Sequence, residues 1–100
     1  MKMIPMLAVT GLFTAGLMTG AFAYSGEKLA KNAKVTLEQA TAIALKARPG
    51  KITDKELEKE KGGSGLRFSF DIKGMDAKAY EVGVDAMTGV VLENGAADKD

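Results

Sequence analysis

Apolar and polar residues alternate in two segments of the second half of the chain. The apolar positions of the first segment are Leu66, Phe68, Phe70 and Ile72. Those of the second segment are Tyr80, Val82 and Val84. Alternate residues of a β-strand point to opposite faces of a sheet, so each pattern predicts a strand with one buried face. Gly74-Met75-Asp76 turns the chain between the two strands.

A helix is predicted over Val35–Arg48. Thr36 and Gln39 have the spacing of a capping box, in which each side chain bonds to the backbone N–H of the other residue. Pro49-Gly50 ends the helix, because proline cannot continue it. One face of this helix is apolar and rich in alanine, with the positions Leu37, Ala40, Ile43, Ala44 and Ala47.

The charged segment Lys51–Glu60 carries conflicting signals. Lysine, glutamate and leucine favour a helix, and Thr53 with Glu56 imitates a second capping box. The apolar residues are only Ile52 and Leu57, too few to bury one face of a helix. We therefore interpret the segment as an irregular edge strand, whose lysines and glutamates discourage pairing with other molecules.

Burial of these apolar faces predicts the fold class. The helix has one apolar stripe and the strands have one apolar face, so each covers the other. We expect an α+β fold in which one amphipathic helix packs on a three- to four-stranded antiparallel meander sheet. The other face of the sheet is expected to meet solvent or a polar partner, and its residues are Arg67, Ser69, Asp71, Lys73, Glu81 and Asp85.

The first 23 residues resemble a secretory leader in three parts. Lys2 gives a positive start, a mostly apolar stretch follows, and Ala21 and Ala23 occupy the positions −3 and −1 before Tyr24. Signal peptidases accept small side chains there, so we expect residues 1–23 to be a signal peptide cleaved before Tyr24. An uncleaved anchor is the weaker interpretation, because the apolar stretch is short for a membrane span. The leader predicts a periplasmic or secreted protein without membrane attachment after cleavage.

Three further segments complete the expected organisation. Residues 24–34 are polar and are predicted to form a flexible lead-in, residues 35–93 the folded domain, and residues 94–100 a flexible tail.

Charge and composition exclude several classes of function. The chain has 14 Lys and Arg against 13 Asp and Glu, and one of the 14 is Lys2 in the leader, so residues 24–100 balance at 13 of each sign. Nucleic-acid binding requires a clustered excess of positive charge, so no nucleic-acid partner is expected. We also expect no field of one sign that would steer a charged substrate.

We expect that the protein is not an enzyme and that it has no catalytic, cofactor-binding or metal-binding residues. Cysteine and histidine are absent, which removes thiolate nucleophiles and imidazole bases or ligands. The acidic residues lack the spacing of a calcium-binding loop. No serine lies in a recognisable nucleophile motif.

The sharpest local motif is the turn at Asp85, Ala86, Thr88 and Gly89. Aspartate accepts hydrogen bonds from turn N–H groups, and glycine adopts a positive φ, so a structural role as a hairpin staple is favoured over a contact loop for a partner. A short fourth strand, Val90–Glu93, follows the turn.

Three pieces of the chain in this order resemble the PepSY domain family. They are the helix Val35–Gly50, the alternating strands, and Val82–Val91, which matches the closing pattern V-x-V-D-A-x-T-G-x-V. The resemblance also favours a strand at Lys51–Glu60. It implies a small, stand-alone exported member without an attached peptidase domain.

The resemblance further implies a protein partner that is a peptidase. We expect a binding module that modulates or inhibits a secreted or envelope peptidase, with Val90, Val91 and Leu92 as the candidate edge for an extended segment of the partner. The alternative is a sensory or accessory protein of the envelope that binds a partner or small ligand and leaves peptidases unaffected.

Overall fold

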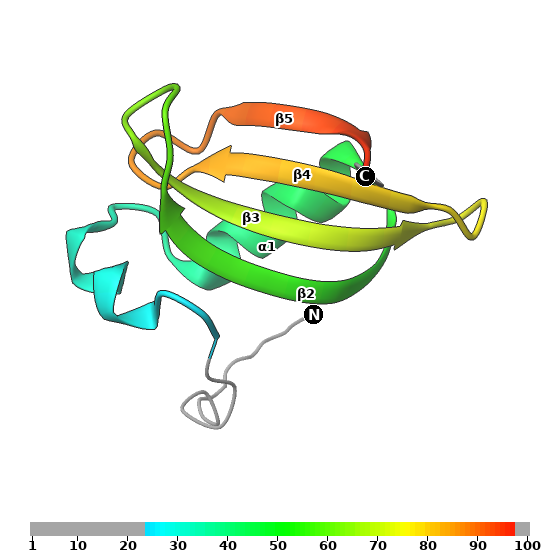
Figure 1. The fold of residues 1–100 in the computed structure, drawn as a ribbon, viewed down its shortest axis with the longest axis horizontal. Helices are drawn as coiled ribbons and strands as arrows, with labels where there is room; N and C mark the ends of the chain where they lie inside the picture. Colours follow the sequence, from blue (N-terminus) through cyan, green and yellow to red (C-terminus); the bar gives the residue numbers. More distant parts are fainter. Residues whose placement is uncertain (1–23, 98–100) are drawn as a thin grey trace, which may run out of the picture.

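Six elements follow one another along residues 24–97, the part of the chain that the computed structural model describes. They are the 3₁₀-helix η2 (Glu27–Asn32), α1 (Leu37–Ala47), β2 (Gly50–Lys59), β3 (Leu66–Gly74), β4 (Ala79–Asp85) and β5 (Val91–Ala96). The strands form one sheet in the order β2-β3-β4-β5, and every neighbouring pair is antiparallel (Figure 1). The α+β fold with a meander sheet is therefore confirmed.

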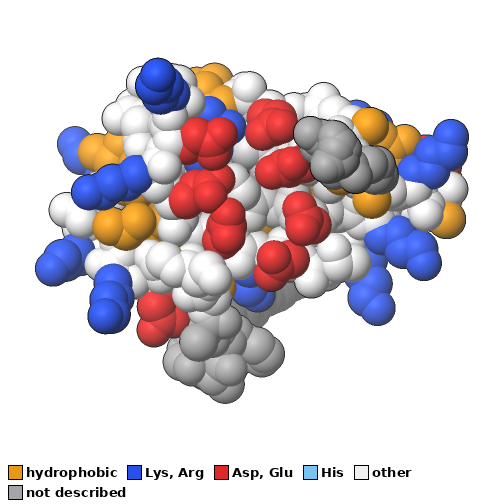
Figure 2. All heavy atoms as spheres, in the orientation of Figure 1, with side chains coloured by type: hydrophobic (Ala, Val, Ile, Leu, Met, Phe, Trp, Pro, Cys, Tyr) orange, Lys and Arg blue, Asp and Glu red, His pale blue; other side chains and the backbone are white. Residues whose placement is uncertain are grey.

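The two faces of the sheet have different surroundings. Helix α1 lies behind the sheet in Figure 1 and covers one face, which we call the inner face. The opposite face, the outer face, points toward the viewer in Figure 2 and carries no helix of the described residues. Side chains of the inner face form the core, and those of the outer face define the main exposed surface of the sheet.

The predicted capping box begins α1. The Gln39 N–H donates to Thr36 Oγ1 at 3.0 Å, and the Thr36 N–H donates to Gln39 Oε1 at 2.9 Å. The helix ends at Ala47, and Arg48 is already extended, because the residue before a proline is disfavoured in the helical region. The sequence thus fixes both ends of this helix locally.

Segment 50–59 is a strand in spite of its helix-forming residues. It pairs with β3 along its length, and Leu57, opposite Phe68, is 2% exposed. Ile52 and Leu57 are an odd number of positions apart, so a regular strand would point them to opposite faces. The register shifts between Ile52 and Asp54, and this bulge brings both apolar side chains to the inner face.

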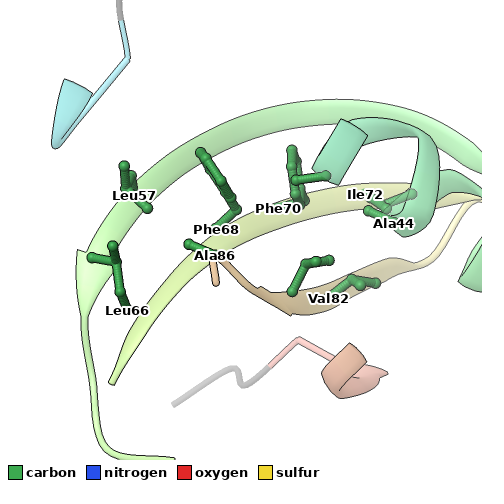
Figure 3. Close-up of a cluster of buried hydrophobic side chains, with 10 residues drawn as sticks. Ala44, Leu57, Leu66, Phe68, Phe70, Ile72, Val82 and Ala86 are labelled. Carbon is green, nitrogen blue, oxygen red and sulfur yellow. The ribbon is translucent and has the colours of Figure 1, made fainter. Parts of the chain in front are cut away.

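The core forms between α1 and the inner face. Figure 3 shows Phe68, Phe70 and Ile72 of β3 pointing to the side where Ala44 of the helix lies. Ala40 and Ala44 are fully buried, and their small side chains let the helix backbone approach the sheet closely. Burial of each phenylalanine contributes roughly 2 kcal/mol of hydrophobic stabilisation. The predicted burial of the helix stripe against this face is confirmed.

Tyr80 is covered differently from the other residues of this face. It pairs with Ile72 but remains partly exposed, near the C-terminal end of α1. The Arg48 guanidinium lies 3.9 Å from the centre of the Tyr80 ring, and the tyrosine hydroxyl donates a hydrogen bond to Asp76. A cation–π contact therefore replaces helix packing at this end of the sheet.

Two segments expected to be flexible contain regular structure. In the lead-in, η2 forms, and Ser25 makes a parallel bridge to Glu56 while its carbonyl accepts from the Leu57 N–H at 2.9 Å. In the tail, β5 continues to Ala96, because its backbone pairs with β4 as far as Tyr80. Backbone pairing with an existing edge orders polar residues that have no periodicity of their own.

Candidate functional site

The turn after β4 is built around the Asp85 carboxylate. Its Oδ1 accepts hydrogen bonds from the backbone N–H groups of Met87 at 2.8 Å and Thr88 at 3.1 Å. Gly89 has a φ of 82° and its N–H donates to the Asp85 carbonyl at 2.8 Å. The sequence predicted that Asp85 accepts bonds from turn N–H groups and that Gly89 has a positive φ, and the turn has both features.

A second loop reaches the same carboxylate and was not foreseen. Ser64 donates its backbone N–H to Asp85 Oδ2 at 2.7 Å and its hydroxyl to Oδ1 at 2.8 Å. The contact joins the segment Gly62–Gly65 to a residue 21 positions further along the chain. Gly63 has a φ of 54°, and a Cβ there would lie 2.3 Å from Asp85 Oδ2. The glycine is therefore required for the close approach of this loop to Asp85.

The environment of Asp85 determines its charge. The residue is 1% exposed, and burial alone would raise its pKa. Hydrogen bonds from Ser64, Met87 and Thr88 outweigh burial and lower the pKa from 3.8 to about 2. Asp85 is thus a carboxylate at neutral pH, and its oxygens are occupied by donors from the protein itself. This arrangement favours the structural role over proton transfer or ligand binding.

Ala86 connects this turn to the start of α1. It is fully buried, and its carbonyl accepts from the N–H groups of Lys34 and Val35, both at 2.9 Å. Its own N–H donates to the Leu66 carbonyl at 2.8 Å. The Asp85 turn therefore joins the start of α1, β3 and β4. These contacts give Asp85, Ala86 and Gly89 a structural role in the turn.

The candidate partner edge lies directly after the turn. Val90 is 56% exposed and Val91, the first residue of β5, is 37% exposed. Leu92 differs, because it is partly buried and its methyl groups lie about 3 Å from where a Cβ on Gly63 would be. In residues 24–97 no strand pairs with the outward side of β5, so this edge has backbone groups available.

The outer face is neither evenly solvated nor balanced in charge, contrary to the sequence-based expectation. Arg67, Ser69 and Asp85 are all at least nine-tenths buried there. Carboxylates gather in the middle of the face, seen in red in Figure 2. By register and contact they are Asp54, Glu56, Glu58, Glu60, Asp71, Glu81 and Glu93. A balanced sequence has folded into a surface with a strong local excess of negative charge.

Arg67 lies flat in this acidic surface. A Cβ on Gly83 of β4 would be 3.2 Å from both Cδ and Nη1 of Arg67, so the arginine crosses the strand where a side chain is missing. Its Nη1 is 3.4 Å from Glu93 and 4.0 Å from Glu60, and its Nη2 donates to the Lys61 carbonyl at 2.9 Å. The glycine between two valines thus makes room for a buried cation.

Other expected site residues are placed as follows. Ala21 and Ala23, at the predicted cleavage point, lie outside the described residues, and Tyr24 is the first residue described. Among residues 24–97, no acidic residues are grouped in a way that could hold a metal ion. Within the same residues, no helix has the length and hydropathy to cross a membrane.

Comparisons with known proteins add one finding. The family model PepSY, described as the peptidase propeptide and YPEB domain, matches residues 34–94. This stretch runs from the entry of α1 into β5, and it includes the Asp85 turn. Neither the comparison with curated proteins nor the comparison with solved structures found a match.

Proposed function

Because this chain belongs to the PepSY family, we propose that it is a binding module without catalytic activity that restrains a secreted or envelope peptidase. The family description links the fold to peptidase propeptides, which supports a peptidase as the partner. The partner contact is an extended segment of the peptidase that adds to the open edge of β5.

The observation that carries this proposal is the exposed apolar start of β5. Strand addition requires an unpaired backbone edge and neighbouring side chains that the incoming strand can cover. Val90 and Val91 supply exposed apolar surface at the edge, and β5 contains a single charged residue, Glu93. Edges that must stay unpaired usually carry lysine or proline, and β5 has neither.

The opposite edge of the sheet is protected. Strand β2 carries Lys51, Lys55 and Lys59, and the Ser25 segment already pairs with it at Glu56 and Leu57. The two edges are therefore unequal, and this difference favours β5 as the site of strand addition.

Export is part of the same proposal. The leader pattern and the family both support a periplasmic or secreted location, with cleavage between Ala23 and Tyr24. Mass spectrometry of the protein from the exported fraction tests this directly. A chain that retains residues 1–23 contradicts the cleavage.

The peptidase proposal is tested with the full chain, expressed with its leader and isolated from the exported fraction. Immobilised protein is exposed to the secreted peptidases of the producing cell, and hydrolysis of a peptide substrate is measured with and without it. We expect capture of a peptidase and a lower rate of hydrolysis.

Two variants locate the contact. Val90→Lys combined with Val91→Lys adds charge to the β5 edge, whereas Met75→Lys changes a residue that is 84% exposed at the tip of the β3–β4 hairpin. The first variant is expected to lose inhibition and the second to retain it. Absence of capture and inhibition by the unchanged protein contradicts the function, and capture of a different protein class supports the accessory alternative.

A further inference from the structure

Arg48 is held in one orientation where α1 ends. Its guanidinium lies 3.9 Å from the centre of the Tyr80 ring, and its Nε donates a hydrogen bond to Asn94 Oδ1 at 3.0 Å. Asn94 of β5 is itself fastened to the helix, because its Nδ2 donates to the Ala47 carbonyl at 3.3 Å. A guanidinium that is stacked and bonded in this way loses little freedom when it binds a further group.

The two terminal nitrogens of this guanidinium have no hydrogen-bond or ion-pair partner within residues 24–97. The arginine ion pairs in this part of the chain involve Arg67. Asp76 accepts hydrogen bonds from the Tyr80 hydroxyl and the Lys78 N–H and forms no ion pair with Arg48. Arginine carries five N–H donors and Nε uses one of them, so the donors on Nη1 and Nη2 are available to an incoming acceptor.

The pairing of β5 with β4 directs the Asn94 backbone toward the open edge of the sheet. The Ala97 N–H donates to the Ala79 carbonyl, which makes these two residues a hydrogen-bonded pair. Hydrogen-bonded and non-hydrogen-bonded pairs alternate along an antiparallel ladder, so Asn94 and Val82, three positions along, do not exchange backbone bonds. The N–H and C=O groups of Asn94 therefore point away from β4, where an added antiparallel strand would bond to them.

The same register decides which side chain of an added strand meets Arg48. Val82 is fully buried in the core, so its partner Asn94 has its side chain on the inner face. The residue that an added strand places directly opposite Asn94 points to this face as well. Side chains in opposite positions have Cβ atoms about 5 Å apart. A glutamate at that position would bring its carboxylate beside Asn94 and within reach of the Arg48 guanidinium.

This geometry selects an acidic side chain on the partner. A planar guanidinium binds a carboxylate through two parallel hydrogen bonds. Glu93, the charged residue of β5, lies on the outer face and does not compete for Arg48. Building on the strand addition proposed above, we propose that Arg48 determines the specificity of the β5 edge. The peptidase segment that it accepts adds antiparallel to β5, with an acidic residue opposite Asn94 and apolar residues after it, toward the exposed apolar start of β5.

Two nonapeptides with blocked ends test this proposal on the full chain. Both have valine at odd and threonine at even positions, except that the central residue is glutamate in one peptide and glutamine in the other. NMR titration locates each peptide from the amide shifts along β5 and gives its dissociation constant. We expect the unchanged protein to bind the glutamate peptide about fourfold more tightly than the glutamine peptide. Added salt should reduce this preference, because the contact is partly exposed.

Substitutions of Arg48 separate recognition from its structural contacts. Arg48→Gln should bind the two peptides equally, and Arg48→Glu should prefer a third peptide with lysine at its centre. Lys46→Gln removes a positive charge from the last turn of the same helix and is the matched control, which should keep the preference for glutamate. Each preference is a ratio measured on one protein, so a loss of stability affects both peptides alike and cancels.

The outcomes distinguish this inference from strand addition itself. Equal binding of the glutamate and glutamine peptides, with shifts along β5, overturns the role of Arg48 and leaves the edge as a binding site. A preference for glutamate that persists in Arg48→Gln does the same. Absence of shifts along β5 with either peptide contradicts strand addition at this edge and the role of Arg48 with it. Asp98→Asn with Asp100→Asn should not change the preference, and a stronger preference in that variant assigns Arg48 to the chain's own tail and overturns the proposal.

Discussion

Ser64 donates two hydrogen bonds to Asp85, one from its backbone N–H at 2.7 Å and one from its hydroxyl at 2.8 Å. Ser64 lies in the loop before β3 and Asp85 is the last residue of β4, so the two connections that they begin or end lie at the same end of the sheet. A single carboxylate thereby holds both connections together. The stability of this end of the molecule should depend on that contact.

Asp85→Asn is predicted to lower the free energy of unfolding by about 2 kcal/mol, because charge-assisted hydrogen bonds are lost. In either orientation the new amide presents its NH₂ group to backbone N–H donors, of Ser64 on one side or of Met87 and Thr88 on the other. Ser64→Ala, the milder control, removes the hydroxyl bond to Asp85 and the longer hydroxyl contacts with Leu66 but keeps the backbone N–H bond to Asp85, and should cost about 1 kcal/mol. Urea denaturation measures both, and equal stability of Asp85→Asn and the unchanged protein would refute the staple.

Acid should weaken the same contact over a defined range. The pKa of Asp85 is about 2 in the folded protein against 3.8 for the free group, so the unfolded chain takes up the proton first as the pH falls. The contribution of Asp85 is complete above about pH 4 and is lost progressively toward pH 2. Unfolding curves of the unchanged protein and of Asp85→Asn should therefore converge on acidification. Other groups with shifted pKa values, such as Asp76 and Glu81, affect the stability of both proteins alike. A difference in unfolding free energy between the two proteins that stays constant with pH would contradict the prediction.

Gly83 should tolerate a side chain less well than Gly95 on the same face. A Cβ on Gly83 meets Arg67 at 3.2 Å, whereas a Cβ on Gly95 meets nothing within 4 Å. Alanine is intrinsically better than glycine in a strand by roughly 0.5–1 kcal/mol, so Gly95→Ala should be neutral or stabilising. We expect Gly83→Ala to be less stable than Gly95→Ala by about 1 kcal/mol, since Arg67 must leave its place. Chemical denaturation of the pair gives the difference, and identical values would show that Arg67 does not depend on the missing side chain.

Gly26 should be essential for docking of the N-terminal segment on β2. Its φ is 83°, and a Cβ there would lie 1.7 Å from the Leu57 carbonyl oxygen. Gly26→Ala is expected to detach the segment and to abolish the hydrogen-exchange protection of the Leu57 N–H, which donates to the Ser25 carbonyl. Gly65→Ala is the control, because Gly65 also has a positive φ, of 92°, but has open space around it. Protection of Leu57 that survives Gly26→Ala would mean that the segment can dock without this close approach.

The sequence by itself determined the elements whose signals are local. The capping box at Thr36 and Gln39 placed the start of α1, Pro49 placed its end, and the alternation from Leu66 to Ile72 and from Tyr80 to Val84 gave the two central strands and their buried face. The turn bonds of Asp85 were predictable for the same reason, since they join residues two and three positions apart. Each of these patterns depends on residues that are close together in the sequence, so the sequence alone shows which groups are buried or hydrogen-bonded.

Only the tertiary structure decided the features that depend on residues far apart. Pairing with β3 made Lys51–Lys59 a strand against its helix propensity, and a bulge turned both of its apolar residues inward. The Ser64 contact with Asp85 and the position of Arg67 over Gly83 also required the fold. The charge of residues 24–100 is balanced when it is counted along the sequence, yet strand register and the contact with Arg67 collected seven carboxylates, besides the buried Asp85, on one face. Electrostatic potential depends on distances in space, and only the register of the strands fixes those distances.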